Sequence, residues 1–204
     1  MTITSQLKAY VRCGATGLSL LATVGHAEDT VGITPDITVF VVPTDNGPQS
    51  ISRNQDEAHM LRGEWARTSR PCPNFCIQPM TPADGVTTIG ELELIAMLQD
   101  PNQMVIDSRV TSNFEGGAIP GAVNIPYTQA ADRLDELGCE IDFEGFICEG
   151  DAVKSVALYC NGPWCGQSPT AARRMIAAGF PAEKISYYRG GMQVWRMLGL
   201  TVTE

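Results

Sequence analysis

Histidine and positive charge are both scarce in this sequence of 204 residues. Its 14 lysines and arginines stand against 23 acidic residues, which gives a formal net charge of −9 at neutral pH. With no basic run to offset this balance, the chain is poorly suited to bind nucleic acid or an anionic membrane surface by bulk electrostatics. Of the 2 histidines, only His59 lies beyond residue 27. We therefore expect neither a Cys–His hydrolase nor a zinc site, and no cofactor.

The sequence also lacks an apolar stretch long enough to span a membrane. Its first residues carry Lys8 and Arg12, a short apolar segment from Gly14 to Val24, and the small-residue pattern Gly25-His26-Ala27. This arrangement is typical of a cleaved export signal. We predict a signal peptide over residues 1–27 and a periplasmic location, with a disordered cytoplasmic leader as the alternative.

Six cysteines follow this leader, and they fall into three local couples. An even number of cysteines in an exported protein suggests disulfides. We predict one disulfide between Cys72 and Cys76 and another between Cys139 and Cys148, each joining the ends of a loop-rich segment. A metal site is the alternative for both couples, but their spacings differ from that of a zinc knuckle. The third couple lies at residues 160 and 165.

The chain divides near residue 85 into an irregular part and a regular part. Residues 28–85 contain one credible strand at 37–42 and are predicted to wrap onto the main domain as an extension. From residue 86 onward, short apolar strands alternate with helices, which indicates an α/β fold with a mainly parallel sheet covered on both faces. In such sheets, ligands bind beyond the carboxyl ends of the strands. We expect helices at 58–65, 92–98, 130–137 and 170–178, a last helix through 195–198, strands at 104–106, 122–125, 156–160 and 186–188, and an irregular segment at 138–151.

The most informative stretch runs from Val156 to Gly179. An apolar strand ends at Cys160, a loop with two glycines and a proline follows, and Ser168-Pro169 is a helix-start signal whose serine can cap free amides. Free backbone amides and the positive end of a helix would favour a thiolate at Cys160. Cys160 is therefore the candidate nucleophile. The alternative is a small buried residue that closes a strand.

Four blocks of the sequence resemble the rhodanese (sulfurtransferase) family, in the family's order. They are Val105–Arg109, Gly117–Pro126, Val156–Phe180 and Ile185–Trp195. The resemblance implies a rhodanese-like domain over residues 86–204 with a five-stranded sheet. It also implies sulfur transfer through a persulfide on the cysteine that ends the third block's strand. The donor would be a small sulfur-containing anion such as thiosulfate or a polysulfide. The acceptor would be a thiol or a cyanide-like nucleophile, and a protein acceptor is left open.

The loop after Cys160 departs from that family in length and in charge. Seven residues separate Cys160 from Ser168, more than in the family's usual loop, and none is Arg or Lys. A sulfur anion would therefore be held mainly by backbone amides, and a phosphatase, which needs an arginine here, is disfavoured. Asp107 and Arg109 are expected either to orient the loop or to pair with each other. The predicted substrate-binding residues are Asn161, Gly162, Trp164, Cys165, Gly166, Gln167 and Ser168.

Cys165 leaves further functions open. With Cys160 it could form a disulfide, which would make the protein an envelope thiol–disulfide redox protein, or it could accept sulfur as a resolving thiol. A loop residue with an exposed sulfur is the simpler interpretation of Cys165. The chain could also be a non-catalytic binding module that uses the same fold.

Overall fold

The computed structural model of the protein describes residues 30–73, 75–143 and 145–203. The signal peptide predicted at residues 1–27 lies outside these ranges. Within them, no helix is both long and apolar enough to pass through a membrane.

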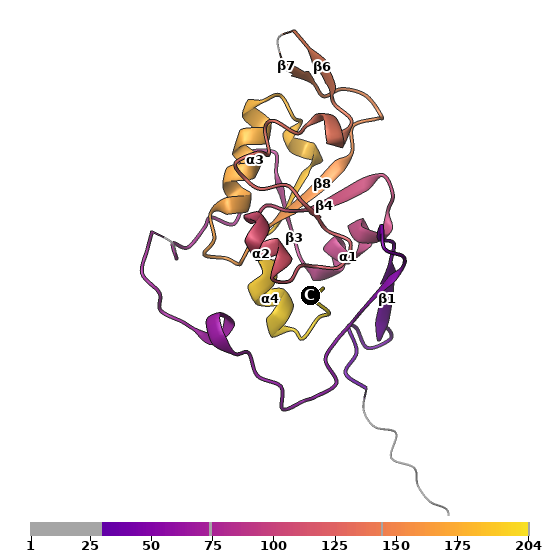
Figure 1. Ribbon diagram of the computed structural model, residues 1–204, viewed down its shortest axis with the longest axis vertical. Coiled ribbons are helices and arrows are strands. Elements are labelled where there is room, and N and C mark those ends of the chain that lie inside the picture. The colour runs from indigo at the N-terminus through magenta and orange to yellow at the C-terminus, as the bar shows by residue number, and fades with distance from the viewer. Residues whose placement is uncertain (1–29, 74, 144, 204) are drawn as a thin grey trace, which may run out of the picture.

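A five-stranded parallel sheet forms the centre of the protein (Figure 1). Its register pairs Asp107 with Tyr159 and Tyr159 with Tyr188, so three neighbouring strands end at the same edge. The sheet and its covering helices confirm the predicted α/β fold. The strands, in spatial order, are β3 (Thr87–Ile89), β9 (Ile185–Tyr188), β8 (Ser155–Tyr159), β4 (Gln103–Asp107) and β5 (Val123–Asn124).

Helices cover both faces of this sheet, and each face has its own core. Val156 and Leu158 of β8 pack into the core under α3, whereas Ala157 and Tyr159 pack into the core under α1 and α4. Alternate side chains of a strand point to opposite faces, so a strand buried on both faces is apolar throughout. The helices are α1 (Glu91–Gln99), α3 (Gln167–Ala177), α4 (Gly191–Met197) and the short α2 (Thr111–Glu115), with a 3-10 turn η3 (Ala182–Lys184) before β9.

The N-terminal extension begins with a hairpin instead of the single strand predicted. Strand β1 (Val39–Val42) pairs antiparallel with β2 (Gln49–Ser52). Val42 and Ile51 are fully buried in the core that α1 covers. The side-chain amide of Gln99, at the end of α1, donates to the carbonyl of Val41 at 3.1 Å. The hairpin therefore anchors the extension to the domain.

Residues 53–85, which we call the strap, run around the side of the domain and appear as the purple arc beside α4 in Figure 1. The helix predicted at 58–65 is wrong, because this part of the strap forms only a 3-10 turn, η1 (Gly63–Ala66). Gly63 has a φ of 56°, a left-handed conformation that interrupts any right-handed helix running from 58 to 65. The strap is thus an extended segment held by side-chain contacts.

The helix predicted at 130–137 is also wrong. It reduces to one 3-10 turn, η2 (Asp135–Leu137), which ends at Gly138 with a φ of 90°. A side chain at Gly138 would collide with the carbonyl of Ala152, so the chain passes too close to its neighbour for any other residue.

Residues 138–151 are more regular than predicted, because they contain a second hairpin. Strand β6 (Glu140–Asp142) pairs antiparallel with β7 (Gly145–Ile147). A disulfide between Cys139 and Cys148 closes the base of this hairpin, and both cysteines are buried against the core under α3. The disulfide therefore ties the hairpin to the domain.

Candidate active site

The candidate active site lies at the sheet edge where β4, β8 and β9 end. Cys160 directly follows β8 and opens the loop 160–166, which we call the thiol loop. The backbone of this loop is held by the start of α4: the N–H of Met192 donates to the carbonyl of Cys160, and that of Gln193 to the carbonyl of Asn161, both at 2.9 Å. Gly191 has a φ of 55°, and a side chain there would collide with the Cys160 carbonyl oxygen. The glycine is needed for this close approach.

The Cys160 thiol is buried, with 2% of the residue exposed. The hydroxyl of Ser168 donates to its sulfur at 3.0 Å, and the sulfur lies 3.2 Å from the carbonyl oxygen of Cys165, to which the thiol can donate. Burial raises the pKa of Cys160 well above its ordinary value, and the neighbouring Cys165 thiol raises it further. The hydroxyl and the amide of Ser168 act in the opposite direction. At neutral pH, Cys160 is therefore a protonated thiol in the resting protein.

Ser168 has a different role from the one its sequence position suggested. Helix α3 begins at Gln167 with Gly166 as its N-cap, so Ser168 lies inside the first turn and makes no cap. Its side chain is fully buried and points to the Cys160 sulfur. The helix start thus delivers one hydroxyl and one amide to the thiol, instead of the full ring of amides that we expected.

The backbone amides of Asn161 and Gln167 point to Cys165. Its thiol is buried rather than exposed, with 5% of the residue accessible. The Asn161 side-chain amide lies 3.8 Å from its sulfur, and the Gln167 side-chain oxygen lies 3.6 Å away. A hydrogen bond from the Cys160 thiol, followed by those from the Gln167 and Asn161 backbone amides, lowers the pKa of Cys165 to about 7 against the opposing effect of burial. Cys165 is thus the more acidic thiol.

Asp107 and Arg109 form a buried ion pair beside the thiol loop. Both residues are at most 1% exposed, and an Arg109 Nη2 to Asp107 Oδ2 distance of 2.6 Å accompanies contacts from Arg109 Nε to both carboxylate oxygens. The same Nη2 donates to the carbonyl of Gly117 at 2.8 Å. Burial acts to lower the pKa of Arg109, but the bonds to Asp107 more than offset it and leave that pKa raised. Of the two roles we considered, pairing with each other is the one these contacts describe.

The strap covers the tip of the thiol loop, which no local sequence pattern signals. The ring of Phe75 stacks on Trp164 with 3.7 Å between ring centroids, and the Arg70 guanidinium lies 4.3 Å above the Phe75 ring. The N–H of Gln78 donates to the Pro163 carbonyl at 2.9 Å. A disulfide between Cys72 and Cys76 encloses this part of the strap. A segment more than 80 residues upstream thus forms a wall of the site.

A family model for the rhodanese-like domain matches residues 91–198, just over half of the chain. The chain belongs to the rhodanese-like domain family. Within this family, the matched region includes the ion pair at the end of β4, the thiol loop and the start of α4 that holds it. The strap lies before the matched residues and is therefore an addition to the rhodanese-like domain.

Curated relatives match part of the chain at low identity. The chain is 32% identical over 124 residues to the HTH-type transcriptional regulator Rv0324 of Mycobacterium tuberculosis, covering 61% of this chain and 46% of that protein. It is 26% identical over 106 residues to the thiosulfate:glutathione sulfurtransferase of Saccharomyces cerevisiae, covering 52% of this chain and 73% of that protein. The chain thus spans less than half the length of the mycobacterial relative.

Solved rhodanese-like structures align with part of the chain. A rhodanese-related protein from Thermoplasma volcanium aligns with a TM-score of 0.41 at 23% identity, over 57% of this chain and 97% of that one. The human single-domain sulfurtransferase TSTD1 aligns with a TM-score of 0.41 at 18% identity, over 55% of this chain and 96% of that one.

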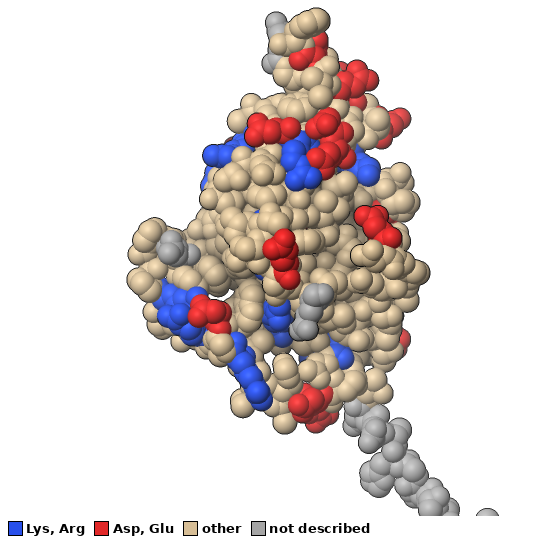
Figure 2. All heavy atoms as spheres, viewed as in Figure 1, with Lys and Arg blue, Asp and Glu red and all other residues tan. Residues whose placement is uncertain are grey.

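A cavity of about 340 Å³ lies between the strap and the rhodanese-like domain, beside the thiol loop. Arg70 of the strap contributes positive charge to its lining, although Glu64 is paired with that arginine at 2.6 Å. Figure 2 shows basic and acidic side chains gathered together on the strap, at the left of the view. The absence of Arg and Lys from the thiol loop is thus partly offset from outside it. The cavity is lined by Glu64, Trp65, Arg70, Arg109, Ser112, Asn113, Gly116, Asn161 and Trp164.

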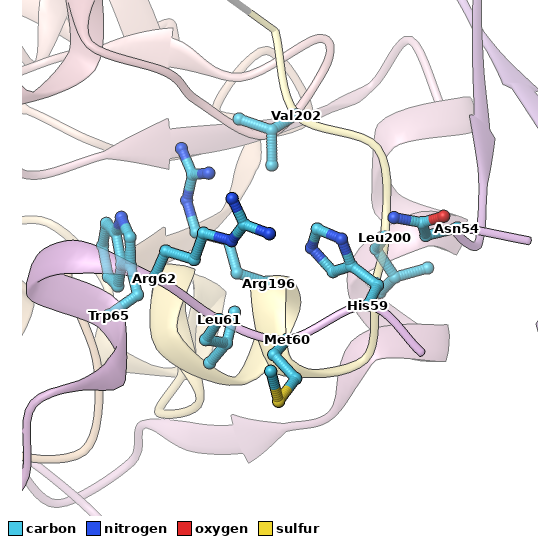
Figure 3. A pocket seen from close by; sticks show the side chains of 10 residues that line it. Asn54, His59, Met60, Leu61, Arg62, Trp65, Arg196, Leu200 and Val202 are labelled. Carbon is cyan, nitrogen blue, oxygen red and sulfur yellow. The ribbon is translucent and has the colours of Figure 1, made fainter. Parts of the chain in front are cut away.

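A second cavity, of about 390 Å³, lies on the far side of Trp65 and includes no residue of the thiol loop. Figure 3 shows the side chains of His59, Arg62 and Arg196 around it. His59, which falls within the helix predicted at 58–65, therefore lines a cavity. Across the described parts of the chain, no group of three or more His, Cys, Asp and Glu side chains is arranged to hold a metal ion.

Proposed function

We propose that this rhodanese-like protein is a sulfurtransferase that carries sulfane sulfur as a persulfide on Cys160. The observation that carries the proposal is the contact between the Ser168 hydroxyl and the Cys160 sulfur at 3.0 Å, at the strand end where the family loop begins. A hydroxyl and an amide that both donate to one sulfur stabilise negative charge on it. That charge develops when the thiol attacks a donor and again when a persulfide is deprotonated.

The loading step uses both thiols of the loop. The Cys160 sulfur attacks the outer sulfur of a donor such as thiosulfate, a new S–S bond forms, and the donor's own S–S bond breaks. The electron pair of the broken bond leaves with sulfite. The proton of Cys160 passes to the Cys165 thiolate, the neighbouring sulfur whose pKa and that of Cys160 influence each other by their proximity. Because the pKa of Cys165 is about 7, a large fraction of this thiol is available as the base at neutral pH.

The donor is a small anion, since the lining of the cavity beside the loop combines the Arg70 guanidinium with uncharged polar groups such as Asn161 and Ser112. The pairing of Arg70 with Glu64 weakens its attraction for anions, so a polysulfide is as suitable a donor as thiosulfate. The acceptor is a thiol or a cyanide-like nucleophile, and it takes the outer sulfur of the persulfide.

Persulfide formation is tested most directly in a Cys165→Ser variant, where the loop has a single thiol. After mild reduction that leaves the Cys72–Cys76 and Cys139–Cys148 disulfides intact, the protein is mixed with thiosulfate or a polysulfide and its intact mass is measured. We expect a gain of one sulfur atom, located at Cys160 by peptide mapping and lost on addition of cyanide as thiocyanate forms. Cys160→Ser in the same background should gain none. An unchanged mass with both donors, in the wild type as well as in Cys165→Ser, would refute the proposal.

A thiol–disulfide redox function is the second candidate, and it is favoured by two free cysteines close together in the loop, with the Cys160 sulfur 3.2 Å from the Cys165 carbonyl oxygen. Such a protein would exchange this pair with external dithiols without any sulfane donor. Reduction of insulin disulfides by the mildly reduced protein tests this function, and Cys165→Ser should abolish it.

We also propose that the protein is exported and works in the periplasm, with residues 1–27 removed and residues 28–85 retained as an extension of the rhodanese-like domain. Two disulfides in the described residues support an oxidising compartment. N-terminal sequencing of the protein from the periplasmic fraction should begin near Glu28. Recovery of the uncleaved chain in the cytoplasm would refute this proposal.

A further inference from the structure

We propose that Cys165 resolves the Cys160 persulfide, releasing hydrosulfide and leaving a Cys160–Cys165 disulfide that a dithiol must reopen. The inference rests on the proposed persulfide chemistry and adds to it a second catalytic thiol, a product and a class of acceptor. It starts from the position of Cys165, whose carbonyl oxygen lies 3.2 Å from the Cys160 sulfur and whose own sulfur lies 3.8 Å from the Asn161 side-chain amide.

Access favours a nucleophile that is already inside the site. Only 2% of Cys160 and 5% of Cys165 are exposed, and the strap closes the tip of the loop through Phe75 on Trp164. A bulky thiol from solution would have to displace this wall to reach the persulfide. Cys165 needs no such movement, because the Cys160 sulfur already lies against this residue, 3.2 Å from the Cys165 carbonyl oxygen. An attack within the loop also avoids the entropic cost of bringing two molecules together.

The acidity of the two thiols also favours Cys165 as the nucleophile that attacks the persulfide. Thiolates are the attacking species in sulfur exchange, and a thiol whose pKa lies near the ambient pH attacks most efficiently. Cys165, with a pKa of about 7 set by the Cys160 thiol and by the Gln167 and Asn161 amides, meets this condition. Its side chain is therefore both the base during loading and the nucleophile during resolution.

The sulfur atom that Cys165 attacks determines the product of the resolution step. If the Cys165 thiolate attacks the inner sulfur of the persulfide, a Cys160–Cys165 bond forms, the S–S bond to the outer sulfur breaks, and hydrosulfide leaves with the electron pair. If it attacked the outer sulfur, the Cys160 thiolate would have to leave. A thiol with a raised pKa is a poor leaving group, and burial gives Cys160 such a pKa. The first route is therefore favoured, and no oxidant is needed, because the sulfane sulfur is reduced to hydrosulfide as the two cysteines are oxidised.

The resulting disulfide defines the class of the final acceptor. A Cys160–Cys165 disulfide is reopened by thiol–disulfide exchange, in which a dithiol is oxidised and both cysteines regain their protons. With thiosulfate as the donor, the whole cycle converts thiosulfate and a dithiol into sulfite, hydrosulfide and a disulfide. Dithiothreitol is the probe for the reopening step, and a protein dithiol of the same compartment is the class of acceptor that we propose.

The experiment compares the wild type with Cys165→Ser and Cys165→Ala, each mildly reduced, loaded with thiosulfate or a polysulfide and freed of excess donor. Hydrosulfide and intact mass are followed together. In the wild type we expect one hydrosulfide for each protein loaded and a Cys160–Cys165 disulfide, found by non-reducing peptide mapping and removed by dithiothreitol. Both variants should keep the persulfide and release no hydrosulfide until dithiothreitol is added.

The outcomes separate this inference from the function on which it rests. A persulfide that lasts as long in the wild type as in the two variants would overturn the role of Cys165 and leave the sulfurtransferase proposal standing. A complete absence of sulfur on Cys160 in both variants, together with no sulfur gain and no hydrosulfide release by the wild type, with either donor, would overturn both. Melting temperatures of the three proteins show whether the loop has kept its structure.

Discussion

Removal of the Ser168 hydroxyl is the sharpest test of the site, because one contact is deleted from a fully buried position. Ser168→Ala removes the 3.0 Å bond to the Cys160 sulfur and leaves the backbone amide of residue 168 in place. A hydrogen bond to a charged group contributes about 1.5–3 kcal/mol, and 1.4 kcal/mol is a factor of ten, so persulfide formation should slow by about 10- to 100-fold. Because the hydroxyl lowers the pKa of Cys160, its loss should also move the pH–rate profile to higher pH.

The assay is the initial rate of sulfur uptake from a polysulfide, followed by mass spectrometry in a Cys165→Ser background. Ser108→Ala is a matched control, since Ser108 is equally buried at the end of β4 and its hydroxyl has no hydrogen-bond partner among the described residues. It should react at the rate of the parent protein. The reasoning would be refuted if Ser168→Ala also reacted at that rate while remaining folded.

Three further predictions concern the ion pair, the second thiol and the strap. Arg109→Met leaves Asp107 charged and buried, so the free energy of unfolding in urea should fall by about 3–5 kcal/mol. Alkylation of Cys165 should rise with pH through a midpoint of about 7, because the thiolate is the reactive form, and Cys160→Ala should move that midpoint upward by removing the hydrogen bond from residue 160. Phe75→Ala breaks an aromatic stack, so tryptic cleavage of the strap should become about 2- to 10-fold faster.

Each of these predictions has a control or a contrary result within the same chain. Arg67 forms an exposed ion pair with Glu64, so Arg67→Met should leave the urea midpoint unchanged. Phe143 is an exposed ring at the tip of the β6–β7 hairpin, and Phe143→Ala should leave cleavage of the strap unchanged. A Cys165 midpoint that stays near 7 after Cys160→Ala would show that the amides alone set the acidity of this thiol.

The parallel sheet and the position of Cys160 could be predicted because their signals are local. Val156 to Tyr159 must be apolar at every position to fill two cores, and this distinguishes a strand buried on both faces from a surface strand. A cysteine at its end, followed by a loop and a helix start, is then confined to the ligand-binding edge of the sheet. The same logic places Asp107 there, because β4 ends in register with β8.

The direction of the loop amides could not be predicted, because it depends on backbone angles that the sequence leaves free. The amides of Asn161 and Gln167 turn toward Cys165, and Ser168 enters the helix instead of capping it. The strap was equally hidden, since the stack of Phe75 on Trp164 joins residues far apart in the chain. Contacts of this kind carry no periodicity, and only the packed structure brings them together.

Cys160 is shielded from water, whereas Cys165 carries negative charge more readily, and a single buried thiol cannot combine these two properties. Burial at the strand end keeps Cys160 beside Ser168 and away from water, but it also raises the pKa of Cys160. The amides of Asn161 and Gln167 favour negative charge on a second sulfur, that of Cys165, whose carbonyl oxygen lies 3.2 Å from the Cys160 sulfur. A loop longer than the family's usual one gives Cys165 room among those amides. Loop length and the second cysteine therefore act together, and a shortened loop without Cys165 would lose the base and the resolving thiol at once.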